Sequence, residues 1–151
     1  METLLWVILA VLITVFLTWA YATAQRLDRL HVRVDRARNA LEAALDRRAA
    51  VVAVAYPAAA LEARRVEEAG LTPGDFSTRI ARERDLGARL QKIGASESAK
   101  IADADARVML ALRFYNDAVA DTRALRLRPI VRILRLGGTA RLPEFFELAD
   151  A

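Results

Sequence analysis

The side chains that could do chemistry are few in this sequence. There is no cysteine, which excludes disulfides and thiolate sites, and there is one histidine, His31. A helical bundle can hold a di-iron centre through Glu-x-x-His pairs on two of its helices. The residue three positions before His31 is Asp28, and no second histidine exists to form another pair. The sequence therefore predicts no metal centre and no cofactor.

Four acids fall on one predicted helix, at Asp103, Asp105, Asp117 and Asp121. Arg107 follows Asp103 by four residues, and Arg113 precedes Asp117 by four. Opposite charges at this spacing pair on the surface of a helix. We interpret these acids as surface ion pairs rather than as catalytic carboxylates.

The segment ARRVEEAGL, residues 63–71, resembles the end of the Nudix hydrolase box, R-E-U-x-E-E-x-G-U, where U is aliphatic. Matching positions are Glu67, Glu68, Gly70 and Leu71. The Glu that should help to ligate Mg²⁺ is replaced by Arg64, whose positive charge opposes metal binding. A Nudix domain also needs a mixed sheet, and no strand pattern is visible. A degenerate Nudix-type hydrolase is the alternative function, and the end of a helix followed by a glycine cap is the simpler interpretation.

The strongest basic cluster lies in residues 123–141, which contain no acid. Its candidate partner-binding residues are Arg126, Arg128, Arg132 and Arg135. Such a cluster suits anionic lipid, nucleic acid or an acidic protein, with a solvated helix face as the simpler alternative. Because no aromatic residues are interleaved with the arginines, we do not expect nucleic acid to be the partner.

The run Arg113-Phe114-Tyr115-Asn116 is unusual for a helix interior. Tyr115 lies in the apolar stripe of its predicted helix, and asparagine has a low helix propensity. A buried polar pair can form hydrogen bonds between helices and fix their register. We predict that structural role for Tyr115 and Asn116.

The N-terminal segment Thr3–Ala24 has no charged residue. As a helix it spans about 33 Å, enough to cross a hydrocarbon core of about 30 Å. Trp6 and Trp19 lie near its ends, with Tyr21 beside the second, as expected at the two membrane interfaces. No basic residue precedes the apolar run, which favours an uncleaved anchor over a signal peptide.

Five arginines follow the anchor within about 15 residues, at Arg26, Arg29, Arg33, Arg36 and Arg38. Because basic flanks stay on the cytoplasmic side, the rest of the chain is expected in the cytoplasm, with Arg26, Arg29 and Arg33 at the lipid headgroups of the cell membrane. Small residues recur every four positions inside the span, at Ala10, Thr14, Thr18 and Ala22. They could seat a second copy of the helix and make a homo-oligomer.

The remaining pattern is helical throughout and predicts an all-α fold. The anchor, residues 1–24, continues into an antiparallel three-to-four-helix bundle over residues 25–136, followed by an irregular tail, 137–151. The first helix is expected to reach about Ala69, with a kink or a new helical turn at Pro57. Two further helices would then end with the basic cluster far from the membrane.

The chain resembles the LemA family of bacterial membrane proteins. The resemblance rests on the anchor that runs into a long helix, on Arg113, Tyr115 and Asn116 with the residues beside them, on Pro129 and on Phe145-Phe146-Glu147. It implies a single-pass anchor and an antiparallel, coiled-coil-like bundle without an established enzymatic activity. The function expected is therefore a membrane-anchored scaffold or interaction protein, with lipid and an unidentified protein as partners.

Overall fold

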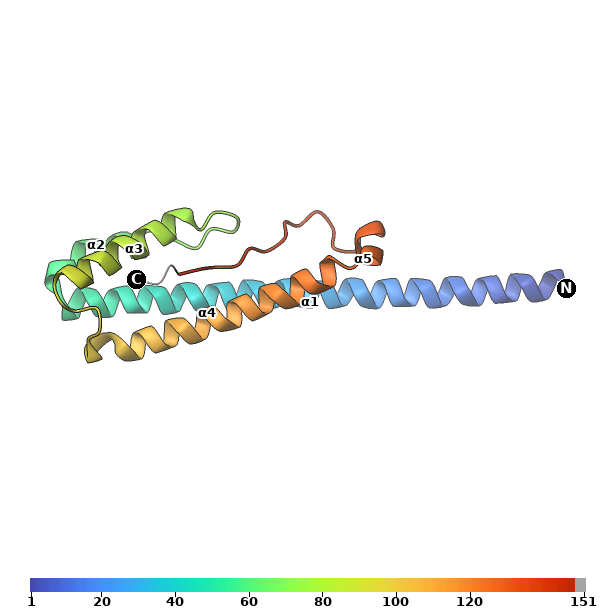
Figure 1. The fold of residues 1–151 in the computed structure, drawn as a ribbon. Helices are drawn as coiled ribbons and strands as arrows, with labels where there is room; N and C mark the ends of the chain where they lie inside the picture. The colour runs from blue at the N-terminus through green and yellow to red at the C-terminus, as the bar shows by residue number, and fades with distance from the viewer. Residues whose placement is uncertain (149–151) are drawn as a thin grey trace.

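The structure, a computed structural model, describes residues 1–148 and contains helices without any strand in that range (Figure 1). The predicted all-α fold, with an N-terminal helix that continues into an antiparallel bundle, is confirmed. Residues 149–151 of the predicted tail lie outside the described residues.

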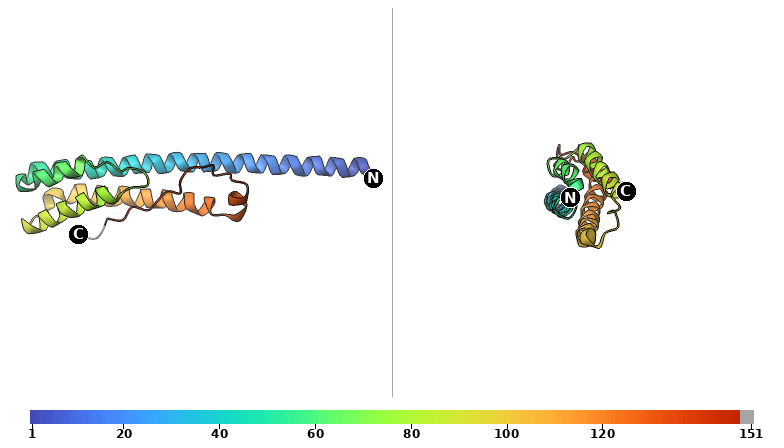
Figure 2. Two further views of the ribbon diagram at one scale, coloured as in Figure 1. Left: turned by 90° about the horizontal axis from the view of Figure 1, so that it is seen from above. Right: turned by 90° about the vertical axis from the view of Figure 1, so that its left-hand side faces the viewer.

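Helix α1, Glu2–Ala55, is 54 residues long and extends far beyond the other helices at its N-terminal end (Figures 1 and 2). No glycine or proline interrupts it. Its first part is exposed along its whole circumference, whereas its second part carries a buried stripe consisting of Leu27, Val34, Leu41, Leu45, Ala49 and Val52. One uninterrupted helix is thus both the apolar segment and a core helix of the bundle.

Pro57 ends α1 and reverses the chain. Proline has no N–H to donate and disfavours helical backbone in the residue before it. Tyr56 accordingly has φ −134° and ψ 81°, and a short 3₁₀ turn, η1 (Pro57–Ala59), leads into α2 (Ala60–Glu67). Helix α2 packs back along α1. A new helical turn thus begins at Pro57, one of the two predicted alternatives, but the expectation that the first helix reaches about Ala69 is wrong, because α1 ends at Ala55.

The loop after α2 is fixed to α1 through the backbone of Leu71. The Leu71 N–H donates to Glu42 Oε1 at 3.1 Å, and Arg38 Nη1 donates to the Leu71 carbonyl at 2.8 Å. A Cβ at Gly70 would lie 3.0 Å from Glu42 Oε1, so glycine suits this close approach. The Nudix-like residues therefore form a helix end and a tethered loop, and residues 1–148 lack the sheet which that family's domain requires.

Helix α3 (Ser77–Lys92) runs back toward the far end of α1, and α4 (Ala99–Arg126) returns alongside α1 toward the apolar segment. The Ser98 side chain accepts the Lys100 N–H and caps α4. The inward stripe of α4 is buried, except for the half-buried Leu112, and consists of Ile101, Ala104, Val108, Leu112, Tyr115, Val119 and Thr122. A short helix, α5 (Pro129–Ile133), follows α4 after a break before Pro129.

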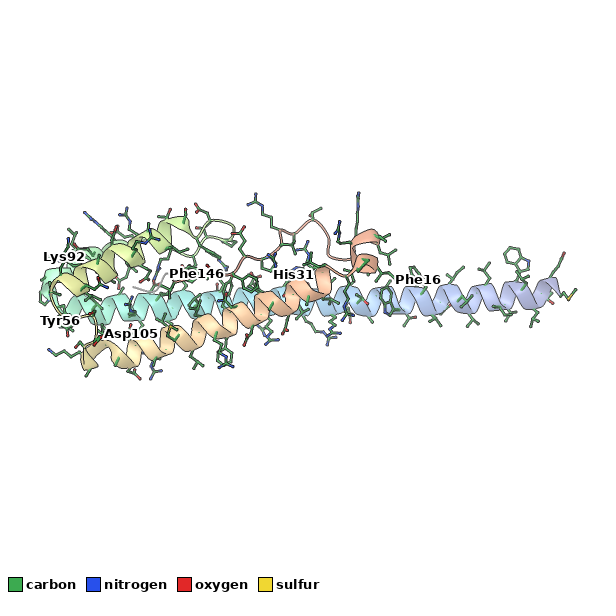
Figure 3. The ribbon with its side chains drawn as sticks, in the orientation of Figure 1. Phe16, His31, Tyr56, Lys92, Asp105 and Phe146 are labelled. Carbon is green, nitrogen blue, oxygen red and sulfur yellow. The ribbon has the colours of Figure 1, made fainter. Side chains whose placement is uncertain are left out.

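Three groups of buried side chains stabilise this arrangement. The central one joins Leu41 and Leu45 of α1 to Phe76, Tyr115 and Phe146. A second group fills the far end of the bundle around Val52, Val66 and Leu90. The third joins Leu27, Leu125 and Val131 beside the apolar segment. After α5 the chain runs without helix back along the bundle, and this returning segment brings Phe146 into the central core (Figure 3).

Candidate functional sites

The apolar half of α1 is a candidate membrane segment. Among residues 1–148, α1 is the one helix long and apolar enough to cross a membrane, and its most apolar stretch is not covered by other parts of the chain. Trp6, Trp19 and Tyr21 are exposed on it. Figure 3 shows Phe16 on the part of α1 that projects beyond the bundle.

The hydroxyl groups of Thr14, Thr18 and Thr23 in this segment donate to carbonyls of the same helix. Thr14 Oγ1 donates to the Ala10 carbonyl at 2.8 Å, and Thr18 Oγ1 donates to the Thr14 carbonyl at 2.8 Å. Such bonds let threonine lie in a lipid-facing helix without an unpaired donor. Thr14 and Thr18 belong to the predicted small-residue stripe. The role of that stripe in self-association stays a prediction.

Helix α4 binds the returning tail through a row of polar side chains, Tyr115, Asn116, Arg123 and Arg126, which we call the tail clasp. Asn116 makes two bonds to Phe146: its Nδ2 donates to the Phe146 carbonyl and its Oδ1 accepts the Phe146 N–H, each at 3.0 Å. The Tyr115 hydroxyl donates to the Glu144 carbonyl at 2.7 Å. An asparagine amide has a donor group and an acceptor oxygen, so it can bond both the N–H and the carbonyl of one residue, as a neighbouring strand would.

The arginines of the clasp extend this row. Arg123 Nη1 donates to the Pro143 carbonyl at 3.0 Å, and its guanidinium lies 5.6 Å from the centre of the Phe145 ring. Arg126 donates to the carbonyls of Ala140 and Arg141 at 2.6 and 2.9 Å. Because each of these hydrogen bonds goes to a backbone atom, the clasp fixes the path of residues 140–146 largely independently of which side chains they carry.

These contacts revise two predictions. Tyr115 and Asn116 form hydrogen bonds to the tail and not to another helix. The predicted role in joining two helices is therefore wrong. Arg126, predicted to bind a separate partner, is held by the tail backbone. Arg113 is exposed, Phe146 is fully buried and Phe145 is exposed on the tail.

Burial raises the pKa of Tyr115 to about 12. Its hydroxyl therefore stays protonated and can donate to the Glu144 carbonyl.

A cluster of charged side chains lies between α1, α3 and α4. It is not among the predictions from the sequence. Arg79 is fully buried and pairs with Glu83 Oε1 at 3.2 Å and with Asp46 at 2.9 Å, and it donates to the Ala69 carbonyl at 2.8 Å. Arg48 pairs with Glu83 at 3.0 Å and with Asp105. A cavity of about 260 Å³ between α3 and α4 borders this cluster. The pairs account for Arg48 within the apolar stripe of α1, since each buried charge has a partner of opposite sign.

Burial raises the pKa of Glu83, against the opposing attraction of Arg48 and Arg79. Folded protein therefore holds this proton to a higher pH than the unfolded chain does. It follows that the contribution of Glu83 to the free energy of unfolding is greatest at low pH. That contribution declines as pH rises from the ordinary value of 4.5 through the raised one.

Replacing Glu83 with glutamine removes this titration while keeping an oxygen that can accept from Arg79. We expect the stability of Glu83→Gln relative to the original chain to increase between about pH 4 and about pH 7. The measurement is urea unfolding of the full chain in detergent micelles, followed by circular dichroism. Glu97→Gln, at an exposed loop position, is the matched control. A relative stability that stays constant or declines would contradict the expected sign.

The described residues hold no group of three or more His, Cys, Asp or Glu side chains placed to bind a metal. Asp103 pairs with Arg107 at 2.9 Å on the surface of α4, as predicted, and Asp121 pairs with Arg33 of α1 at 2.8 Å. His31 lines a second cavity with Arg38 and Tyr115, beside the tail. No family model, curated protein or solved structure matches the chain.

The basic cluster lies beside the apolar segment and not at the far end of the bundle, which corrects the predicted position. Val131 and Leu125 pack against Leu27, three residues after Ala24. The error follows from Pro57: because α2 folds back, the bundle has one more reversal than expected, so α4 runs toward the apolar segment of α1. Arg128, Arg132 and Arg135 are therefore near Arg26 and Arg29, and all five are exposed.

Proposed function

We propose that this chain is a LemA-like, single-pass membrane protein whose helical bundle is a cytoplasmic scaffold or interaction module without enzymatic activity. One observation carries the proposal: α1 passes without interruption from an uncovered apolar segment into the core of the bundle. Lipid, an unidentified protein and a second copy of the chain are the proposed partners.

Two further features support a scaffold. The three most deeply buried polar side chains, Arg79, Glu83 and Thr122, are paired with one another or with backbone, an arrangement that serves structure. The alternative Nudix-type hydrolase is disfavoured because residues 1–148 form no sheet and the box-like segment is the end of α2 followed by a loop bound to α1. Nucleic acid is also disfavoured, because no aromatic side chains are interleaved with the exposed arginines.

Orientation is tested by adding protease to spheroplasts that produce the full chain with a C-terminal tag. We expect residues 25–151 to resist digestion until the membrane is permeabilised, because the arginines after Ala24 keep that side in the cytoplasm. We also expect the protein to stay in the membrane during alkaline extraction with its N-terminal peptide still present. Digestion in intact spheroplasts would contradict the orientation, and loss of residues 1–24 would contradict the anchor.

A matched pair of variants sharpens this test. Changing Arg26, Arg29 and Arg36 to glutamine removes three exposed charges next to the span and should give a mixed orientation. Changing Arg47, Arg64 and Arg65 to glutamine removes the same charge more than about 20 residues from the span, where orientation depends little on it. All six arginines are exposed. Equal behaviour of the two variants would contradict the charge argument.

A further inference from the structure

Helix α5 is packed onto the bundle at the end of the apolar segment. It buries Val131, which is 2% exposed, against Leu27 of α1 and Leu125 of α4. Ala20, Thr23 and Ala24, on the same face of α1 as Leu27, are also partly covered. Figures 1 and 2 show α5 beside the point where α1 leaves the bundle. If Thr3–Ala24 crosses a bilayer, α5 lies at the level of the bilayer surface.

The apolar face at α5 consists of two exposed residues of that helix and one from the turn before it. Ile130 and Ile133 are 46% and 79% exposed, and Leu127, at the end of α4, is 49% exposed. Large aliphatic side chains grouped in this way mark a surface that meets an apolar phase or a partner.

Exposed arginines surround this apolar face. Arg128, Arg132 and Arg135 have no ion pair recorded within residues 1–148, and Arg26 and Arg29 add two charges from α1. Asp28 is the single acid in residues 20–34, and residues 122–141 contain none. Basic and aliphatic side chains together are the composition of segments that lie in the interface of an anionic membrane.

We propose that α5 and its flanking residues are a second membrane contact, which inserts Leu127, Ile130 and Ile133 among the headgroups and binds anionic phospholipid through Arg128, Arg132 and Arg135. The inference rests on the proposed anchor. Lipid is the occupant because the anchor holds α5 at the bilayer surface, within the Debye length of about 8 Å over which anionic lipid attracts arginine. The same tether gives a high effective concentration, so a weak contact is enough.

The test places a spin label on the full chain, which has no cysteine of its own. Ile133→Cys reports on α5, Leu12→Cys on the span, and Val54→Cys on the far end of the bundle, where Val54 is 84% exposed. Each labelled protein is reconstituted in phosphatidylcholine vesicles with or without about one third phosphatidylglycerol. Collision with oxygen, which concentrates in lipid, is compared with collision with a water-soluble nickel complex.

We expect the label at Leu12 to be in lipid in both vesicles, the label at Val54 in water in both, and the label at Ile133 in lipid mainly with phosphatidylglycerol. Changing Arg128, Arg132 and Arg135 to glutamine should lower the ratio of docked to undocked α5 on the order of 100-fold. Changing Arg47, Arg64 and Arg65 to glutamine should leave it unchanged. In about 1 M salt, where the Debye length is about 3 Å, docking should be lost.

The other outcomes separate the inference from the anchor on which it rests. With Leu12 in lipid, water exposure of Ile133 in both vesicles overturns the second contact alone. Lipid exposure of Ile133 regardless of phosphatidylglycerol, or in the triple glutamine variant, overturns the role of the arginines and of anionic headgroups. Water exposure at Leu12 overturns the anchor and the second contact together.

Discussion

The Phe146→Ala variant should lose about 3–5 kcal/mol of unfolding free energy, the range for removing a fully buried phenylalanine side chain. Phe146 is 0% exposed, and its ring meets Phe76 edge-on with the ring centres 5.4 Å apart. It also packs in the group that joins Leu41 of α1 to Tyr115 of α4. Because the returning tail brings this ring into the core from outside the helices, the variant should also release the tail.

The measurement is urea unfolding in detergent micelles, with hydrogen exchange of the Phe146 N–H to report on the tail. Phe145→Ala is the matched control: this ring is exposed and touches mainly Arg123, so its loss should cost about 0.5–1 kcal/mol. Equal costs for the two variants would contradict the placement of Phe146 in the core.

The Arg79→Met variant should cost about 3–5 kcal/mol, the range for breaking a buried ion pair by removing one partner. Methionine matches the length of the arginine stem but supplies no donor. Glu83, 4% exposed, would lose one of its two arginines and the Ala69 carbonyl would lose its bond. Since Arg48 still faces Glu83, we expect a cost near the lower end of that range.

The double variant Arg79→Met, Glu83→Leu separates charge from packing. Removing both side chains avoids a buried carboxylate that keeps only one of its two arginines, while Arg48 keeps Asp105 as its partner. The double variant should therefore be at least about 1 kcal/mol more stable than Arg79→Met alone. Thermal unfolding followed by circular dichroism measures both. A double variant that is less stable than the single one would show that packing around these side chains, and not charge pairing, sets their contribution.

Local patterns in the sequence predict most of the helices but not their directions. Apolar spacing and turn residues indicate α3, α4 and the end of α4 before Pro129, because those signals are contained within a few residues. Pro57 permits either a kink or a reversal, and the choice depends on whether Val66 and Ala63 of α2 can pack on α1. That packing is a tertiary contact, and it reverses the direction of every later helix.

For the candidate site residues too, local sequence signals identify some features, whereas tertiary contacts are not predictable from spacing. Tyr115 and Asn116 stand out locally, but their partner is a backbone segment about 30 residues away, which no spacing rule identifies. Arg79 and Glu83 carry a usable signal: they are four residues apart and flank Ile80 on the inward side of α3. Together with Arg48 in an apolar stripe, that spacing indicates a buried ion-pair cluster rather than surface pairs.

If the apolar segment of α1 spans a membrane, the unbroken backbone of this helix makes the bundle a lever arm on that segment. From Gln25 to Ala55 the helix rises about 46 Å at 1.5 Å per residue. A tilt of about 20°, ordinary for a membrane-spanning helix, moves the Ala55 end sideways by roughly 16 Å. Because a span longer than the hydrocarbon core can tilt to fit it, a thinner membrane would move the far end of the bundle further sideways.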